Sequence, residues 1–116
     1  MTETEAVARI RSLFEWWMAP ENPLPVALAD KFEFDSGLGT MSADDWLWWV
    51  RQNPGWGAVR VLGLVASSTG GSIVFGATDP VTNLRHRISW SVMWNEETLT
   101  RILQTAVTVP EQTELG

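Results

Sequence analysis

The amino-acid sequence predicts an α+β fold in which N-terminal helices pack on one face of a mainly antiparallel sheet. Segments with apolar residues at helical spacing lie in the first half of the chain, and four strand-length segments fill residues 59 to 109. Consecutive strands joined by short turns pair as hairpins, and helices that precede them cover one face of the sheet. With 116 residues we expect a single domain over residues 1–116, in which residues 110–116 form a disordered tail.

Composition favours a soluble, cytoplasmic protein. No apolar run approaches the roughly 20 residues that a membrane helix needs, and the polar, acidic first residues lack the features of a secretory signal. Cysteine is absent, which excludes disulfides and thiolate metal sites. A net charge of -6 argues against nucleic-acid binding, which depends on Lys and Arg side chains that neutralise phosphates.

The first predicted helix covers residues 3 to 18. Thr2 and Glu5 have the spacing of a capping box. Apolar residues at helical spacing follow them, namely Val7, Ile10, Phe14, Trp17 and Met18. Pro20 then interrupts the pattern. A second, short helix is expected from Pro23 to residue 29 or 30, with Asn22 as its cap.

A short strand and a third helix are predicted next. Residues 32 to 35 alternate between Phe and acidic residues, a period of two that is typical of a strand, and the flexible turn Ser36-Gly37-Leu38-Gly39 follows. Ser42 has the position of an N-cap, and Asp45 completes the capping pattern. The helix that begins there is expected to end at Asn53-Pro54-Gly55.

Four strands complete the prediction, over residues 59–67, 72–78, 84–94 and 99–109. The strand over 84–94 divides cleanly into two faces. One face carries His86, Trp90 and most of the apolar bulk, so we expect it to meet the helices. The other face is semi-polar, which suits contact with solvent or with a second subunit.

The segment from Ala27 to Asp35, the glycine at position 39, the capped helix and the four strands together resemble the nuclear transport factor 2-like superfamily. This group includes ketosteroid isomerases, SnoaL-type polyketide cyclases and limonene epoxide hydrolases. The resemblance covers residues 5 to 109 and rests on element order more than on a motif. It implies a cone-shaped α+β barrel whose curved sheet encloses a cavity, and a homodimer formed through the outer sheet surface.

Asp35 is the first candidate for a catalytic group. The resemblance places it where ketosteroid isomerases carry a general-base aspartate, and a carboxylate at the mouth of an apolar cavity has a raised pKa, which suits a base. Alternatively, Asp35 simply begins the turn that follows it. His86 is the second candidate because imidazole changes charge near neutral pH. Its alternative is a place on the surface or the cavity rim.

Other parts of the related active sites have no counterpart. Isomerases of this group use a Tyr and a protonated Asp as hydrogen-bond donors, but the chain has no Tyr, and Trp90 aligns with the second carboxyl. The Arg-x-Asp arrangement of the epoxide hydrolases is missing from the expected strand. A single histidine without a tight acidic cluster predicts no metal site, and we expect no cofactor.

Three functions remain open. The first is a pocket for a small hydrophobic molecule, the second a cofactor-independent isomerase or cyclase-like enzyme with Asp35 as general base, and the third a dimerisation module whose cavity is filled by its own side chains. The expected ligand contacts are Trp90, Trp16, Trp17, Trp56, Phe34 and Gln104. The alternative for each tryptophan is core packing, and for Gln104 it is exposure to solvent.

Overall fold

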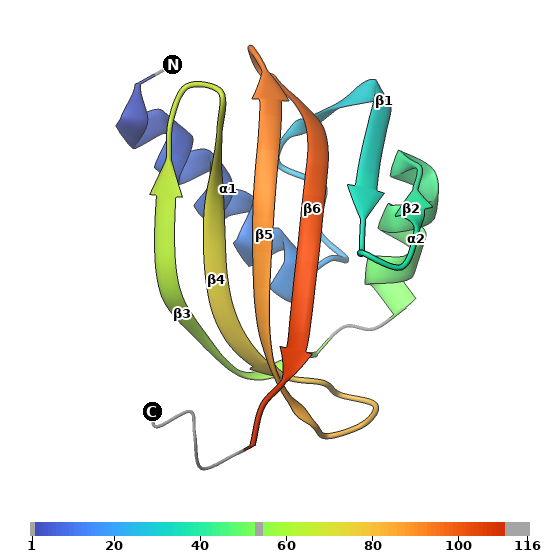
Figure 1. Cartoon of the computed structure of the whole chain (residues 1–116). Coiled ribbons are helices and arrows are strands. Elements are labelled where there is room, and N and C mark those ends of the chain that lie inside the picture. The colour runs from blue at the N-terminus through green and yellow to red at the C-terminus, as the bar shows by residue number, and fades with distance from the viewer. Residues whose placement is uncertain (1, 53–54, 111–116) are drawn as a thin grey trace.

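The computed structural model describes residues 2–52 and 55–110 (Figure 1). The elements are α1 (Glu3–Met18), β1 (Ala27–Asp35), β2 (Thr40–Met41), α2 (Ala43–Gln52), β3 (Gly57–Ala66), β4 (Gly70–Thr78), β5 (Arg85–Asn95) and β6 (Thr98–Thr108). Both long helices and the four C-terminal strands therefore lie close to their predicted bounds. The predicted tail beyond Pro110 and the Asn53-Pro54 segment predicted to end α2 lie outside the described residues.

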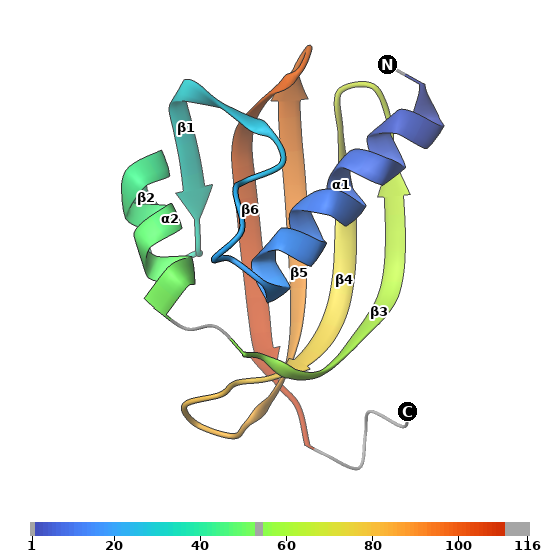
Figure 2. The same cartoon turned by 180° about the vertical axis from the view of Figure 1, so that it is seen from behind.

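One six-stranded sheet organises the fold, with the strand order β2-β1-β6-β5-β4-β3. The pairs β3-β4, β4-β5 and β5-β6 are antiparallel, whereas β1 runs parallel to β6. Helix α1 crosses one face of the curved sheet over β3 and β4, and α2 lies against β1 and β2 (Figure 2). The predicted α+β fold, with helices packed on a curved and mainly antiparallel sheet, is confirmed.

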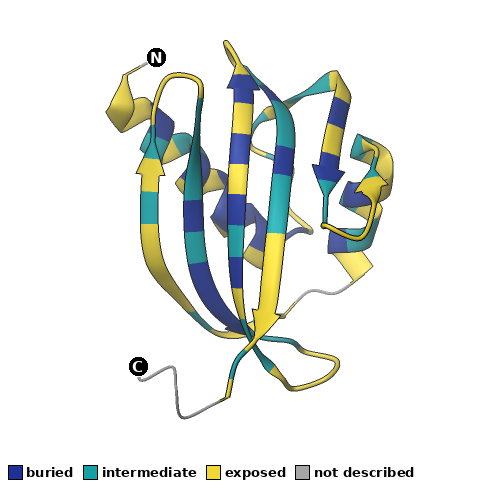
Figure 3. Ribbon diagram, viewed as in Figure 1, coloured by how far each residue is buried: buried dark blue, intermediate teal, exposed yellow. Residues whose placement is uncertain are grey.

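The face of the sheet that meets the helices holds the core, and we call it the inner face. Along β5, buried inner residues such as Ile88, Trp90 and Val92 alternate with more exposed ones (Figure 3). Helix α1 contributes a buried stripe to the same core, formed by Ala6, Ile10, Leu13, Phe14, Trp16 and Trp17. Among the described residues no helix covers the opposite, outer face, which is turned to the viewer in Figure 1.

Both helices begin at the capping signals of the sequence. The Thr2 hydroxyl accepts a hydrogen bond from the backbone N–H of Glu5 at 3.1 Å, and the Ser42 hydroxyl accepts one from Asp45 at 3.3 Å. Such bonds satisfy backbone donors that have no partner within the first turn. Neither described helix is both long and apolar enough to cross a membrane.

The prediction of a short second helix that begins at Pro23 is wrong. Residues 19–26 form turns and irregular chain, and β1 begins at Ala27. Proline lacks a backbone N–H and favours an extended conformation in the residue before it. A helix that began at Pro23 would meet Pro25 within its first turn, with Leu24 biased away from the helical region. The chain instead pairs with β6 from Ala27 onward.

Candidate functional site

A cavity of about 430 Å³ opens between the inner face of the sheet, the ends of both helices and the loop that joins β4 to β5. We call it the inner cavity. Its lining combines apolar walls with a few polar groups, and consists of Trp17, Trp49, Val50, Trp56, Asp79, Val81, Thr82, His86, Ile88, Gln104 and Ala106. The structure thus brings together four of the residues singled out in the sequence, namely Trp17, Trp56, His86 and Gln104.

Trp17 and Trp56 form the aromatic wall of the inner cavity, with ring centroids 5.1 Å apart. Trp17 comes from the last turn of α1 and meets the ring of Trp90 edge-on at 5.7 Å. Trp56 precedes β3, and its ring lies 6.1 Å from that of His86. Aromatic pairs at these separations attract one another. The rings of the core therefore hold the wall in place from behind.

A hydrogen bond between two inner-face residues fixes the amide of Gln104. Strands β5 and β6 place Trp90 opposite Gln104, and Trp90 Nε1 donates to Gln104 Oε1 at 2.9 Å. Among the described residues, Nε of Arg101 is the only buried side-chain nitrogen or oxygen atom without a hydrogen-bond partner. The Gln104 amide nitrogen has no hydrogen-bond partner among the described residues and is not such a buried atom, so it is accessible, and Gln104 is a residue of the cavity lining.

His86 lies at the edge of the inner cavity. Its Nδ1 is 3.3 Å from the hydroxyl of Thr108 on the neighbouring strand, and its ring packs against Trp56. No other described residue forms a hydrogen bond with the ring, so Nε2 is available to a bound molecule. A neutral imidazole donates or accepts there according to its tautomer.

The β4–β5 loop brings a carboxylate, Asp79, to the same edge. Its Oδ1 accepts hydrogen bonds from the backbone N–H groups of Val81 at 2.7 Å and Thr82 at 3.2 Å, which fold the loop into a tight turn. Ala77 pairs with His86, and Asp79 follows Ala77 by two residues. Asp79 follows the end of β4 directly, and it and His86 both line the inner cavity.

The sequence interpretation did not include Asp79 or Thr82. A signal for Asp79 exists, because Phe75 and Ala77 are buried on the inner face of β4 and the two-residue period continues to position 79. No comparable signal marks Thr82, because its place in the cavity depends on how the loop turns back toward β5.

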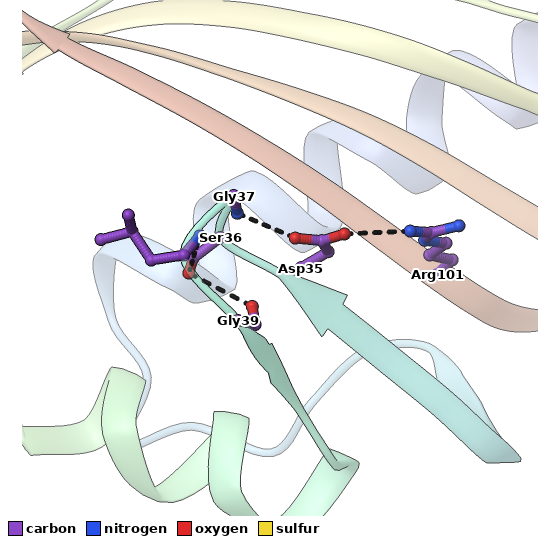
Figure 4. Close-up of polar contacts among 6 residues, drawn as sticks. Asp35, Ser36, Gly37, Gly39 and Arg101 are labelled. Atoms are coloured by element: carbon purple, nitrogen blue, oxygen red, sulfur yellow. Dashed lines mark hydrogen bonds and ion pairs between the residues drawn. The ribbon is translucent and has the colours of Figure 1, made fainter.

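Asp35 is not part of the lining of the inner cavity, and Figure 4 shows its contacts with Gly37 and Arg101. Phe34 pairs with Ile102 in the core, so the next side chain along β1 points to the opposite face. Asp35 accepts hydrogen bonds from the backbone N–H of Gly37 at 2.8 Å and from Arg101 at 3.0 Å. These bonds hold the pKa of Asp35 below its ordinary value. The raised pKa predicted for a cavity base is therefore wrong, and Asp35 has the alternative role of starting the turn.

Trp16, Trp90 and Phe34 lie in the core and are not part of the cavity lining. Trp16 Nε1 donates to the backbone carbonyl of Asn22 at 2.9 Å, and the ring of Phe34 stacks with that of Trp46 on α2. The N–H of Trp90 is bonded to Gln104, so Trp90 has no donor left for a ligand.

Two further hollows lie elsewhere on the molecule. The larger, of about 1000 Å³, lies among strand ends and borders Pro110. Residues 111–116, which follow Pro110, lie outside the described residues. The smaller, of about 280 Å³, is a groove between α1 and β3. Neither of these two hollows is lined by a histidine beside aromatic side chains. The described residues also include no group of His, Asp and Glu side chains that could hold a metal ion.

No protein-family model matches the sequence, and no curated protein matches it. Solved structures do resemble the fold. A provisionally assigned ketosteroid isomerase from Kribbella flavida superimposes with a TM-score of 0.77 at 15% identity, over 94% of this chain and 82% of that one. An LEH-like epoxide hydrolase from M. tuberculosis gives a TM-score of 0.71 at 11% identity, over 90% and 84%. A de novo designed protein with the NTF2 fold gives 0.60 at 11% identity, over 97% and 89%. At these identities the likeness is one of fold.

Proposed function

We propose that this chain, which has the fold of the nuclear transport factor 2-like superfamily, binds a small and largely apolar molecule in its inner cavity. The observation that supports the proposal is that the neighbouring rings of Trp17 and Trp56 both line this cavity. The volume of about 430 Å³ lies within the range of about 300–1,000 Å³ that is usual for small-molecule sites. The few polar groups, His86, Gln104 and Asp79, suit a ligand with one polar end.

The open cavity disfavours a dimerisation module whose hollow is filled by its own side chains. Trp16, Trp46 and Trp90 do fill the core, but space remains beside Trp17 and Trp56. Apolar side chains that face an unfilled space lack the contacts that close packing provides. An apolar ligand would supply these contacts.

Ligand-dependent quenching of tryptophan fluorescence tests the proposal. A panel of small aromatic and terpenoid compounds is titrated into the protein, and a compound that binds is expected to quench Trp17 and Trp56 because both line the cavity. Trp56→Ala is expected to weaken binding by about five-fold or more, since truncation of an aromatic anchor commonly costs more than about 1 kcal/mol.

Trp48→Ala is the matched control, because Trp48 lies on α2 outside the cavity lining and is 65% exposed. It is expected to keep the affinity of the wild type. If no compound quenches, or if the two variants lose affinity equally, the inner cavity is not the binding site.

A second candidate function is acid–base catalysis on the bound molecule, with His86 in place of Asp35 as the group that transfers the proton. The accessible Nε2 of His86 and the carboxylate of Asp79 at the same edge favour it. Histidine is the side chain most often used for this chemistry. Asp35 has no access to the ligand, because it lies on the outer face and is paired with Arg101.

Proton exchange in deuterium oxide separates binding from catalysis. A ketone that binds is incubated with the protein, and NMR follows the loss of the proton signals next to its carbonyl group. A catalyst is expected to accelerate this exchange, and His86→Asn is expected to abolish the acceleration while the ketone still binds. Asp35→Asn, on the outer face, is the control and should keep the wild-type rate. Equal rates in His86→Asn and the wild type would remove His86 from the chemistry.

We also infer a homodimer formed through the outer face of the sheet. Exposed apolar side chains on this face, Val65, Met93 and Val107, lie among hydroxyl groups such as Ser89 and Thr105. A mixture of apolar and hydrogen-bonding groups is usual in protein interfaces. Analytical ultracentrifugation is expected to find a dimer for the wild type and a monomer for Met93→Glu. A monomeric wild type would contradict this inference.

A further inference from the structure

We propose that the inner cavity recognises a hydrogen-bond acceptor on its ligand, such as the carbonyl oxygen of a ketone, aldehyde or ester, and that Trp90 sets this preference by fixing the amide of Gln104. This inference rests on the proposed function, because it names the class of molecule that the cavity takes. Gln104 is the residue that contacts the ligand, and Trp90 is a positioning residue that acts through it.

A glutamine side chain can usually present either end of its amide, because the oxygen and the NH₂ group have nearly the same shape. Here the choice is fixed by Trp90, whose indole nitrogen is a donor only and lies 2.9 Å from Oε1 of Gln104. A flipped amide would set two donors against each other and leave a buried indole N–H without a partner, which disfavours that state by roughly ten-fold or more. The NH₂ group is therefore the end presented to the cavity.

The indole of Trp90 is itself held in one orientation. Trp90 is 1% exposed, and three other rings surround it. The ring centroid of Phe75 is 5.3 Å away, that of Trp17 is 5.7 Å away and that of Phe14 is 6.4 Å away, all in edge-on arrangements. Rotation of the indole would disrupt these contacts. The hydrogen bond to Gln104 is therefore a fixed feature of the core.

The surroundings of Gln104 make its free N–H group selective. The next pair toward the cavity edge is Ile88 with Ala106, both apolar, and the pair after that contains His86. A ligand that displaces water from this apolar surface either accepts a hydrogen bond from the amide N–H or leaves the N–H without a partner. A ligand without an acceptor therefore loses binding free energy. Trp90 and His86 are four residues apart along β5, or about 13 Å. The acceptor therefore binds at the deep end of the cavity and the remainder of the ligand extends toward His86.

Two probes of matched shape test the proposal. Acetylnaphthalene carries a carbonyl acceptor, and isopropenylnaphthalene replaces the oxygen by a CH₂ group at the same ring position. Calorimetric titration of the wild type is expected to give an affinity about five- to ten-fold higher for the ketone, the range expected for one hydrogen bond. In isotope-labelled protein, the side-chain NH₂ signals of Gln104 should shift with the ketone and not with the hydrocarbon.

Trp90→Phe tests the positioning role, because it keeps an aromatic ring and removes the N–H that fixes Gln104. The ratio of the two affinities is expected to fall to within about two-fold, as it should in Gln104→Leu, which lacks the donor altogether. Trp94→Phe is the matched control. Trp94 lies on the same strand and face, but its indole donates to the carbonyl of Ser68 at 2.8 Å, outside the cavity lining. It should keep the wild-type ratio.

The possible outcomes separate the two proposals. Equal affinity of both probes for the wild type would leave a ligand-binding cavity but overturn the recognition of an acceptor. Binding of neither probe would overturn the proposed function together with this inference. A preference for the ketone that persists in Trp90→Phe and disappears in Gln104→Leu would keep Gln104 as the donor and reject Trp90 as the positioning residue. The NH₂ signals of Gln104 are read in the wild type, so they decide on the donor even if a variant fails to fold.

Discussion

Arg101 and Asp35 form an ion pair on the outer face of the sheet, with Nη2 and Oδ2 3.0 Å apart. The pair joins β6 to the end of β1, its parallel neighbour. Both side chains are partly exposed, 44% for Arg101 and 22% for Asp35, so solvent screens their attraction. The clearer effect is on protonation, because the Gly37 N–H and the Arg101 guanidinium both favour the ionised carboxylate and lower the pKa of Asp35.

Asp35→Asn is expected to make the stability of the protein less dependent on pH in the acid range. Because the pKa of Asp35 is lowered in the folded state, the carboxylate stabilises the fold above the unfolded pKa of about 3.9. This contribution is lost as the pH falls through the folded pKa. The urea midpoint of Asp35→Asn should therefore be lower than that of the wild type at neutral pH and should fall less between about pH 5 and pH 2.

Asp30→Asn is the control for this experiment, because Asp30 is an exposed residue of the same strand. It should reproduce the pH dependence of the wild type. If Asp35→Asn also follows the wild-type curve, the ion pair has no effect on stability. Binding of a ligand in the inner cavity is expected to be unchanged in Asp35→Asn, since Asp35 lies on the other face.

Trp16→Phe is expected to destabilise the fold and to leave ligand binding unchanged. Trp16 is buried, and its N–H attaches residues 19–26 to α1 through the carbonyl of Asn22. Phe retains a ring but loses the donor and some volume, which should cost about 1–3 kcal/mol of unfolding free energy in urea titrations. Trp48→Phe, an exposed site on the other helix, should stay within about 0.5 kcal/mol of the wild type. A lower ligand affinity in Trp16→Phe would instead place Trp16 in the cavity wall.

The elements that were predicted correctly are those whose signals lie within the element itself. The caps at Thr2 and Ser42 each involve residues three apart in sequence. The two faces of β5 follow from a period of two over its own residues. Both helices and the four C-terminal strands could therefore be read from the sequence without knowledge of their partners.

Features that depend on pairing between distant segments could not be predicted. The start of β1 at Ala27 reflects its pairing with Thr98, far along the chain, and prolines mask the local strand pattern before it. The bond between Trp90 and Gln104 likewise depends on the register of β5 against β6. For this reason the sequence identified both residues as site candidates without their relation to each other.

The alternation of side chains along β1 predicts the position of Asp35 correctly, whereas the resemblance to isomerases predicts the wrong side of the sheet. Phe32 and Phe34 are buried on the inner face, and strict alternation along a strand places Asp35 on the opposite face. The resemblance to isomerases implied a cavity position from the order of the elements alone. At a strand end, the alternation of the neighbouring side chains predicts the side of the sheet better than element order does.

Gly71→Ala is expected to destabilise the protein at the crossing of α1 and β4. A Cβ atom added to Gly71 would lie 2.5 Å from Cδ1 of Ile10 and 2.5 Å from the backbone oxygen of Val65. Because the oxygen belongs to the sheet backbone, the strand or the helix has to move, and overpacking of this kind costs about 1–3 kcal/mol. Thermal unfolding should show the loss. Gly63→Ala is the control, since a Cβ atom there meets nothing within 4 Å, and a loss of the same size in Gly63→Ala would refute the steric explanation.

Ala58→Gly is expected to stabilise the protein. Ala58 has a φ of 46°, in the left-handed region that non-glycine residues adopt at a cost of about 1 kcal/mol. Its carbonyl oxygen accepts a hydrogen bond from Arg85 at 2.6 Å, which helps to hold this backbone conformation at the start of β3. Glycine removes the strain and keeps the carbonyl, so the free energy of unfolding in urea should rise by about 0.5–1 kcal/mol.

Ala66→Gly is the control, because Ala66 lies at the other end of the same strand and has no positive φ. This substitution should instead lower the free energy of unfolding by about 0.5–1 kcal/mol. Destabilisation of both variants to the same extent would show that the conformation of Ala58 is not strained.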